Sequence, residues 1–242
     1  MIEKDLNNFI KNALIEDVGS GDHSSLASIP KDATSKAHLL VKDNGIIAGI
    51  ELAKMIFNQV DNSLKIIQKL NDGDKVNFGD IAFIAQGNSI SILTAERLVL
   101  NCMQHMSAIA TKTSSLNFLI SDTKCKLLDT RKTTPLNRTI EKWAVKIGGG
   151  TNHRFNLSDE YLIKDNHIGA SQNLVNIIKK AIKNKKGKKI TVEVDNLNQL
   201  KQIIGLRFDR ILFDNMSPKI LKKGIKLSKK LYETEASGGI TL

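Results

Sequence analysis

The sequence predicts an α/β protein in which an N-terminal α+β sandwich-like domain is followed by an incomplete (β/α) barrel. Three observations lead to this fold class. Short apolar segments of strand length surround a single helical segment early in the chain. One long helical stripe follows at about 94–120, and after residue 126 strand-length and helical segments alternate, as in parallel sheets with right-handed crossovers. We therefore predict domains at 1–107 and 108–242, with the long helix running on to about 120.

The N-terminal elements follow from hydrophobic periodicity. Residues 2–15 carry apolar side chains at helical spacing and predict an amphipathic helix. In the next ten residues, 16–25, glycines alternate with acids and hydroxyls, which indicates turns. Strand character is found at 35–43, 63–69 and 81–86, and helical character at 49–60.

The long helix is expected to begin at Thr94, whose hydroxyl suits an N-cap. Apolar residues recur along one face of it and predict that this face is buried. Arg97 falls on another face, together with Asn101 and Gln104.

The C-terminal half alternates between strands and helices. Helical segments are expected at 174–182, at 197–204 and after Ser217 and Pro218, which suit the N-cap and N1 positions. Each strand-like segment ends in charged or hydroxyl residues, so these side chains are expected on the rim where (β/α) barrels build their sites. The five strand-like segments read KLLDT, YLIKD, ITVEVD, RILFD and YETEAS.

Cationic side chains concentrate between residues 129 and 168. Thr139 as an N-cap and four apolar residues at helical spacing predict a helix that ends in the glycines 148–150. Cations near strand ends are typical of sites that hold an anionic ligand in α/β proteins. The cations are Arg131, Lys132, Arg138, His153, Arg154, Lys164 and His167.

Two carboxylates stand at the ends of predicted strands. Glu193 points to the opposite face from Val192 and Val194, because side chains alternate along a strand. A carboxylate inside a barrel is costly unless a cation or hydrogen bonds compensate it. Asp214 ends the next strand and raises the same question. Either residue has a plainer explanation as a helix cap or as the partner of a nearby lysine.

Composition excludes several classes of protein. With 242 residues and 41% hydrophobic content the chain can bury a real core. It has no run of about 18 apolar residues, and its N-terminus lacks a secretory pattern, so we expect a cytoplasmic protein without membrane partners. Cys102 and Cys125 stand singly and indicate neither a zinc site nor a disulfide; we expect both to be small buried residues.

The net charge of +11 suggests a polyanionic partner. Much of it is lysine on expected surface helices and in the run 183–189, which we interpret as a solvated connection. No aromatic-studded basic sheet, helix-turn-helix or zinc-finger pattern accompanies the charge, so we expect no nucleic-acid partner. A small polyanionic substrate explains the clustered cations better.

Three consecutive segments resemble the signature of the quinolinate phosphoribosyltransferases, which are decarboxylating enzymes of the type II phosphoribosyltransferase family. These segments read DTRKTTP at 129–135, GGGTNHR at 148–154 and LIKDNHI at 162–168. The turn EDVGSGD at 16–22 and the helix AERLVLNCMQHMSAIAT at 95–111 are similar to further family segments. The resemblance runs through nearly the whole chain.

The resemblance implies transfer of a phosphoribosyl group from 5-phosphoribosyl 1-pyrophosphate to quinolinate. The products would be nicotinate mononucleotide, pyrophosphate and carbon dioxide. Guanidinium groups bind carboxylates in bidentate fashion, so Arg131, Arg154 and Arg97 are the candidates for the two substrate carboxylates. The resemblance places Arg97 in the active site of a partner subunit and hence implies a homodimer or a higher assembly.

Other site residues are likewise carried by the resemblance. Thr130, Lys132, His153 and Lys164 are expected to contact substrate beside the arginines, and Lys132, Glu193 and Asp214 to be catalytic. Glu193 and Asp214 would serve the ribose and, directly or through water, a Mg²⁺ ion. The turn that presents N–H groups to the 5-phosphate would be formed by Ser237, Gly238 and Gly239. No organic cofactor is expected, because the ribosylated pyridine ring accepts the electrons left by decarboxylation.

Two departures from the family pattern stand out. The family has TTPGLR where this chain has TTPLNR, so the loop after Pro135 lacks a glycine and the role of Arg138 is open. The chain stops at Leu242, whereas the family continues through two further strands and a closing helix, and we therefore expect a barrel without its last strands. The alternatives are a paralogous phosphoribosyltransferase-like protein with another acceptor, of the kind associated with molybdenum transport, and a non-catalytic shortened remnant.

Overall fold

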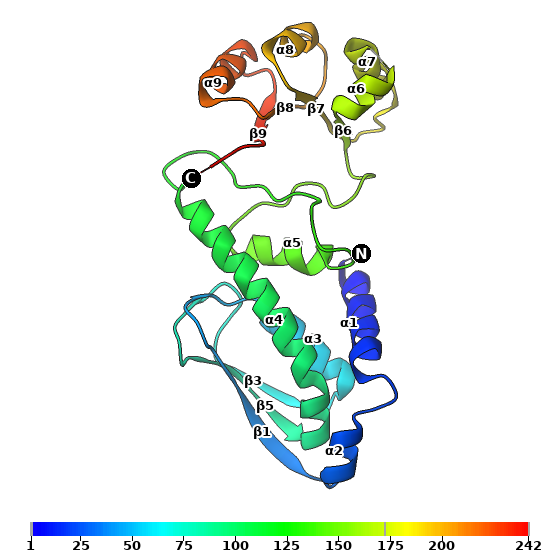
Figure 1. Cartoon of the computed structure of the whole chain (residues 1–242), viewed down its shortest axis with the longest axis vertical. Coiled ribbons are helices and arrows are strands. Elements are labelled where there is room, and N and C mark those ends of the chain that lie inside the picture. The colour runs from blue at the N-terminus through cyan, green and yellow to red at the C-terminus, as the bar shows by residue number, and fades with distance from the viewer. Residues whose placement is uncertain (1, 172, 242) are drawn as a thin grey trace. The chain divides into compact units, whose positions relative to one another are not determined.

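The structure, a computed structural model, describes residues 2–171 and 173–241 (Figure 1). It divides into two compact units, Met1–His153 and Arg154–Leu242. The first unit thus extends well past the boundary expected at 107/108. The reason is packing, since Ile140 and Ala144 are buried in the same apolar cluster as Met106 of the long helix.

The first unit is an α+β domain. Its three-stranded antiparallel sheet has the order β1-β5-β3, and a separate two-stranded sheet pairs β2 with β4. The expected strands and helices are confirmed, whereas β2, β4 and α2 are too short for periodicity to reveal. The bounds are α1 Ile2–Val18, α2 His23–Ser28, β1 Thr34–Leu40, β2 Gly45–Ile46, α3 Ile50–Val60, β3 Lys65–Gln68, β4 Lys75–Val76 and β5 Ile81–Asn88.

The long helix α4, Ser89–Phe118, begins earlier than expected. Asn88 is its N-cap and accepts a hydrogen bond from the Ser91 N–H at 3.1 Å. Thr94 lies inside the helix and donates its hydroxyl to the Ile90 carbonyl at 2.8 Å, so its prediction as N-cap was wrong. The apolar stripe is buried as predicted.

The helix α5, Arg138–Ile147, ends at the expected glycines. Its N-cap position is Asn137 rather than Thr139. Gly149 has φ 87°, the left-handed conformation that ends helices. A Cβ on Gly148 would lie under 3.0 Å from the Ala110 carbonyl oxygen of α4, so glycine is required there for close packing of the two helices.

The second unit is a parallel α/β domain. Its four strands have the order β6-β7-β8-β9 and are all parallel, as the alternating pattern predicted. Figure 1 shows α7, α8 and α9 on one side of this sheet. The bounds are β6 Tyr161–Ile163, α6 Asp165–Ser171, α7 Leu174–Asn184, β7 Ile190–Val194, α8 Leu197–Ile203, β8 Arg210–Asp214, α9 Pro218–Leu227 and β9 Glu233–Ser237.

The two faces of this sheet differ in chemistry. Val192, Val194 and Phe213 belong to the apolar cluster formed with the helices. On the opposite face Arg210 donates to Glu233 at 2.9 Å and to Glu235 at 3.1 Å. The hydrogen bond from Arg210 lowers the pKa of the Glu233 carboxyl. The polar face therefore carries charges that are paired with one another.

The segment KLLDT was expected to be a strand, and this prediction was wrong. It makes a single parallel bridge, Leu128 to Thr151, inside the first unit. Two hydrogen bonds flank it, from Asp129 N to Thr151 O at 3.2 Å and from Thr151 N to Leu127 O at 2.8 Å. The α/β fold class is confirmed, with an N-terminal α+β unit and a C-terminal parallel sheet that has four strands in the described residues.

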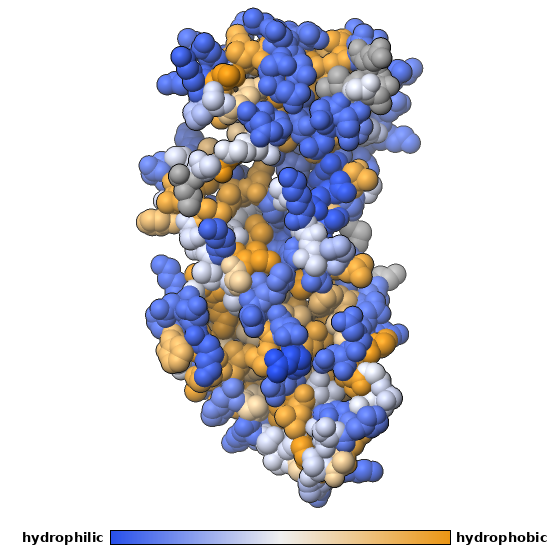
Figure 2. Space-filling model, viewed as in Figure 1, coloured by the Kyte–Doolittle hydropathy of each residue, from blue (hydrophilic) through white to orange (hydrophobic). Residues whose placement is uncertain are grey.

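Most of the positively charged side chains in the described residues lie on the surface. On the face shown in Figure 2, hydrophilic residues cover much of the helices of the second unit, and Lys179, Lys180 and Lys183 of α7 are exposed. Cys102 is buried, which raises the pKa of its thiol to about 11, whereas Cys125 is exposed, contrary to expectation. In the part of the chain that the structure describes, no helix has the length and apolarity needed to cross a bilayer.

Candidate functional site

Three carboxylates meet at the carboxyl edge of the parallel sheet. Glu193 lies on β7, Asp195 follows that strand, and Asp214 ends β8. One carboxylate oxygen of each lies within 4.8 Å of the others, which makes them a candidate metal site among the described residues. The parallel register explains the cluster, because carboxyl ends of neighbouring strands share one edge.

Lys164 pairs with the most buried of these acids. Its Nζ lies 2.7 Å from Glu193 Oε2, and the Glu193 side chain is only 5% exposed. Glu193 faces away from the apolar cluster of Val192 and Val194, as strand alternation predicted. The lysine compensates the burial of this carboxylate, so Glu193 has the lysine partner that its plainer explanation requires.

The glycine turn after β9 is held against Asp214 by a residue that sequence reasoning missed. Asn215 donates its amide to Asp214 Oδ2 at 2.6 Å, and its N–H bonds the Ser237 carbonyl at 2.8 Å. A Cβ on Gly238 would meet Asn215 Oδ1 at under 3.0 Å. Asn215 has φ 51°. The signal available in the sequence was an asparagine directly after a strand end, since asparagine adopts this left-handed conformation more readily than most residues.

In the first unit, Thr130, Arg131 and Lys132 follow the single bridge at Leu128. The Thr130 hydroxyl accepts a hydrogen bond from the Lys132 N–H at 3.0 Å. Arg131 Nε is buried and makes no hydrogen bond to any described residue, so this donor has capacity for a ligand acceptor.

The loop after Pro135, which differs from the family pattern, is held by Arg138. Arg138 donates to Thr133 Oγ1 at 3.1 Å and thereby braces the loop from inside. Leu136, which stands where the family has glycine, takes φ 66° and is 94% exposed. The backbone is therefore left-handed at this position although the residue is a leucine, for which this conformation is strained.

His153 ends the first unit, and its backbone is fixed on both sides. Its N–H donates to Asp129 Oδ1 at 2.8 Å, and its carbonyl accepts from Lys142 Nζ at 3.0 Å. Lys142 and Asp129 also form an ion pair. No sequence pattern indicates this role of Lys142, because the lysine falls within an ordinary helical pattern.

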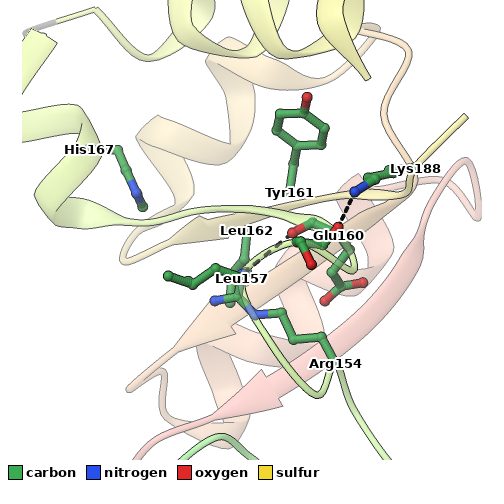
Figure 3. A pocket seen from close by; sticks show the side chains of 8 residues that line it. Arg154, Leu157, Glu160, Tyr161, Leu162, His167 and Lys188 are labelled. Atoms are coloured by element: carbon green, nitrogen blue, oxygen red, sulfur yellow. Dashed lines mark hydrogen bonds between the residues drawn. The ribbon is translucent and has the colours of Figure 1, made fainter. Parts of the chain in front are cut away.

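Arg154 and His167 line a cavity of about 330 Å³ in the second unit (Figure 3). Arg154 Nη1 donates to the Glu160 carbonyl at 3.4 Å. His167 is exposed, and its Nδ1 accepts the Lys164 N–H at 3.0 Å, which ties it to the end of β6. The cavity is lined by Arg154, Leu157, Ser158, Glu160, Tyr161, Leu162, His167 and Lys188.

The predicted site residues thus fall into two groups. In the second unit Lys164 contacts Glu193, and Asp214 lies beside the turn of Ser237, Gly238 and Gly239. The first unit contains Thr130, Arg131, Lys132 and His153 on two segments joined by one bridge. Arg97 is exposed on α4, away from the buried stripe.

Two family models match the chain. The one described as "Quinolinate phosphoribosyl transferase, N-terminal domain" matches residues 22–107, and its C-terminal counterpart matches residues 109–242. These matches meet inside α4, whereas the compact units meet after His153.

Whole-chain relatives agree with the family models. The chain is 42% identical over 258 residues to quinolinate phosphoribosyltransferase [decarboxylating] 2b, mitochondrial, of Nicotiana tabacum, and the match covers 98% of this chain and 73% of that protein. It is 40% identical over 243 residues to the probable nicotinate-nucleotide pyrophosphorylase [carboxylating] of Bacillus subtilis (strain 168), covering 100% and 82%. It superposes on the crystal structure of NadC from Streptococcus pyogenes with a TM-score of 0.93 and 36% identity, covering 98% and 84%.

Proposed function

This chain belongs to the quinolinate phosphoribosyltransferase family, and from that premise we propose how its residues carry out the reaction. The reaction is decarboxylating phosphoribosyl transfer in NAD biosynthesis. The acceptor is quinolinate and the donor 5-phosphoribosyl 1-pyrophosphate. The observation that carries the residue assignment is the meeting of Lys164, Glu193 and Asp214 at the carboxyl edge of the sheet.

Arg131, Arg154 and Arg97 bind the two adjacent carboxylates of quinolinate. Planar guanidinium groups match carboxylates in bidentate geometry, and the buried Nε of Arg131 is a donor without a hydrogen-bond acceptor in the described residues. Lys132, Lys164 and His153 add positive charge around the dicarboxylate, and Thr130 provides a further substrate contact. Together they favour a doubly charged acid over a monocarboxylate.

Glu193 and Asp214 bind the ribose hydroxyls and hold a Mg²⁺ ion. The donor set fits this ion, since Mg²⁺ prefers carboxylate oxygens together with water and phosphate. Asp195 adds a third oxygen within 4.8 Å of the other two. When bound, the ion neutralises charge on the pyrophosphate. Lys164 keeps one Glu193 oxygen occupied, so the other oxygen remains for ribose or metal.

The chemical step needs no general base. The pyridine nitrogen attacks C1 of the ribose with its own lone pair while the bond from C1 to the pyrophosphate oxygen breaks. Lys132 stabilises the departing negative charge, and Glu193 and Asp214 stabilise the cationic sugar. Removing one such preorganised group typically costs about a hundredfold or more in rate.

Decarboxylation follows from the positive charge that ribosylation places on the pyridine ring. Ribosylation makes the ring nitrogen cationic, so the electron pair left at ring C2 when carbon dioxide departs is stabilised within the ring and then takes a proton. The ring acts as its own electron acceptor, and we propose that no organic cofactor takes part.

The 5-phosphate accepts hydrogen bonds from backbone N–H groups of the turn formed by Ser237, Gly238 and Gly239. Both glycines have positive φ.

We further propose a homodimer in which Arg97 of one subunit completes the site of the other, in a cytoplasmic enzyme. Exposure of Arg97 on α4 supports this arrangement. Light scattering after size exclusion should show at least a dimer at micromolar concentration. Arg97→Ala should lose activity and regain part of it when mixed with a Glu193→Ala chain, since mixed dimers contain one intact site; absence of rescue would contradict a shared site.

The decisive experiment follows both products. The purified protein is incubated with carboxyl-labelled quinolinate, 5-phosphoribosyl 1-pyrophosphate and Mg²⁺, and carbon dioxide and nicotinate mononucleotide should appear in equal amounts. Glu193→Ala should lower the rate by about a hundredfold or more. Glu51→Ala, which removes the acid of an exposed pair on α3, is the matched control and should retain activity.

Other outcomes point to the alternatives. Quinolinate binding by calorimetry without any product would favour a non-catalytic remnant. Pyrophosphate release only with another acceptor would favour a paralogous transferase.

A further inference from the structure

Lys142 of α5 is a buried cation that the proposed mechanism does not use. Its exposure is 0%, and it ranks with large apolar side chains among the most completely buried residues of the described chain. A lysine at such a depth requires an anionic partner, because an isolated buried ammonium is strongly unfavourable.

The partner is Asp129, and around the pair lies a connected polar network. The Lys142 ammonium donates to Asp129 Oδ1, and Asn152 donates its amide both to Asp129 Oδ2 and to the Lys142 carbonyl, the latter at 2.8 Å. The Asp129 side chain is 8% exposed. All of these residues belong to the first unit, so these contacts lie within one compact body.

The network holds the backbone of His153 from two directions. Asp129 Oδ1 accepts its N–H at 2.8 Å, and Lys142 Nζ donates to its carbonyl at 3.0 Å. Asp129 also directly precedes the run of Thr130, Arg131 and Lys132. One ion pair is therefore bonded to two segments that carry predicted site residues, 129–132 and 151–153.

Stability alone is a poor reason for such a pair. Two buried charges repay their desolvation only with very good geometry, and well-packed apolar replacements are often as stable. The two segments are otherwise joined by the single bridge from Leu128 to Thr151 and its flanking hydrogen bonds. A short pairing of this kind leaves the register weakly specified, and the ion pair specifies it.

We propose that Lys142 and Asp129 are positioning residues that set the placement of His153 relative to Arg131 and thereby the binding of the dicarboxylate. This inference rests on the proposed function, because it assigns quinolinate to these residues. It separates the two substrates: loss of the pair should weaken quinolinate binding and leave binding of the phosphoribosyl donor unaffected. The ribose, the metal ion and the 5-phosphate of the donor are assigned to the second unit, and Lys132 of the first unit acts on the pyrophosphate only as it departs.

The test uses three variants. Lys142→Met leaves Asp129 buried without its cationic partner and should lower the melting temperature. The double variant Lys142→Met with Asp129→Leu removes both charges and should regain much of the melting temperature, while kcat/KM for quinolinate stays about 100-fold below wild type, the loss typical of an ångström-scale misplacement. Asn152→Ala keeps both charges and should raise the KM for quinolinate only.

Each outcome is decisive. Recovery of both the melting temperature and kcat/KM for quinolinate in the double variant would show a purely structural role and overturn the proposal. An unchanged quinolinate KM in Asn152→Ala would overturn it as well, even where the other variants fail to fold. An equal rise in KM for both substrates would argue against a role confined to the dicarboxylate.

Controls separate this proposal from the proposed function. Lys54→Met removes the cation of the exposed pair with Glu51 and should leave both KM values unchanged. If the wild-type protein binds quinolinate but gives no product, calorimetric dissociation constants replace KM, and the proposal is tested without turnover. If the wild type does not bind quinolinate, the proposed function fails first and this proposal fails with it.

Discussion

The two compact units hold their candidate site residues in different ways. In the second unit, Glu193 and Asp214 stand at the ends of neighbouring parallel strands, and their positions follow from the period of a strand. In the first unit, Arg131 and His153 stand on irregular segments joined by one bridge and by buried side-chain bonds. The sheet positions one group, and tertiary contacts position the other.

This difference predicts that substitutions in the two units have different effects on stability and catalysis. On the polar face of the sheet, changing a site carboxylate alters the charge of the site and removes few packing contacts. In the first unit, removing a positioning residue leaves buried polar groups unsatisfied. Variants of the first unit should therefore show coupled losses of stability and binding, and variants of the second unit mainly kinetic losses.

The largest expected effect on stability is at Lys142. Lys142→Met should reduce the free energy of unfolding by about 3–5 kcal/mol, because it leaves the Asp129 carboxylate buried without its cation. Denaturant titration followed by circular dichroism measures this. Lys54→Met in the exposed pair with Glu51 should change it by less than about 1 kcal/mol. Equal effects of the two variants would remove the contrast between buried and surface pairs.

An intermediate effect is expected at the glycine turn. Gly238→Ala should cost about 1–2 kcal/mol in backbone strain, since Gly238 has φ 78°, and should also weaken binding of the phosphoribosyl donor, because the new Cβ meets Asn215. Gly205→Ala is the matched control: it has φ 95° and open space around it. The control should lose stability, measured by thermal melting, without a change in KM for the phosphoribosyl donor. A KM change in both variants would mean that strain rather than the Asn215 contact matters.

The smallest effect is a gain. Leu136→Gly should stabilise the protein by up to about 1 kcal/mol, because it relieves the left-handed strain of an exposed leucine, offset in part by the entropy of glycine in the unfolded chain. Thermal melting measures the change. Leu157→Gly, at an exposed leucine that is not among the positive-φ residues, should be destabilising instead. A loss of stability in Leu136→Gly would show that the strain is borne elsewhere in the loop.

Periodicity carried the sequence predictions where structure is regular. It predicted the buried stripe of α4, the parallel strands of the second unit and the orientation of Glu193. It failed where a tertiary contact decides. The segment 126–130 has a strand composition but pairs at one bridge only. Thr94 satisfied a capping rule that Asn88 satisfies six residues earlier in the chain.

The site residues that the sequence missed share one property. Lys142 resembles any lysine on a helix, and only its contact with Asp129, a residue from a different segment, makes it a buried ion. Asn215 resembles a turn residue, and only the proximity of Gly238 relates it to the glycine turn. Their roles arise from pairs of residues distant in sequence, and no local pattern encodes such pairs.

The burial of Lys142 also has a chemical consequence. Reagents that modify primary amines react with lysines that solvent reaches, and most lysines of this chain lie on such surface. The Lys142 amine is enclosed by Asp129 and the His153 carbonyl, so the folded protein shields it. Its modification therefore requires opening of α5 from these segments. Under mild labelling, the rate at which Lys142 is modified measures how often the first unit opens.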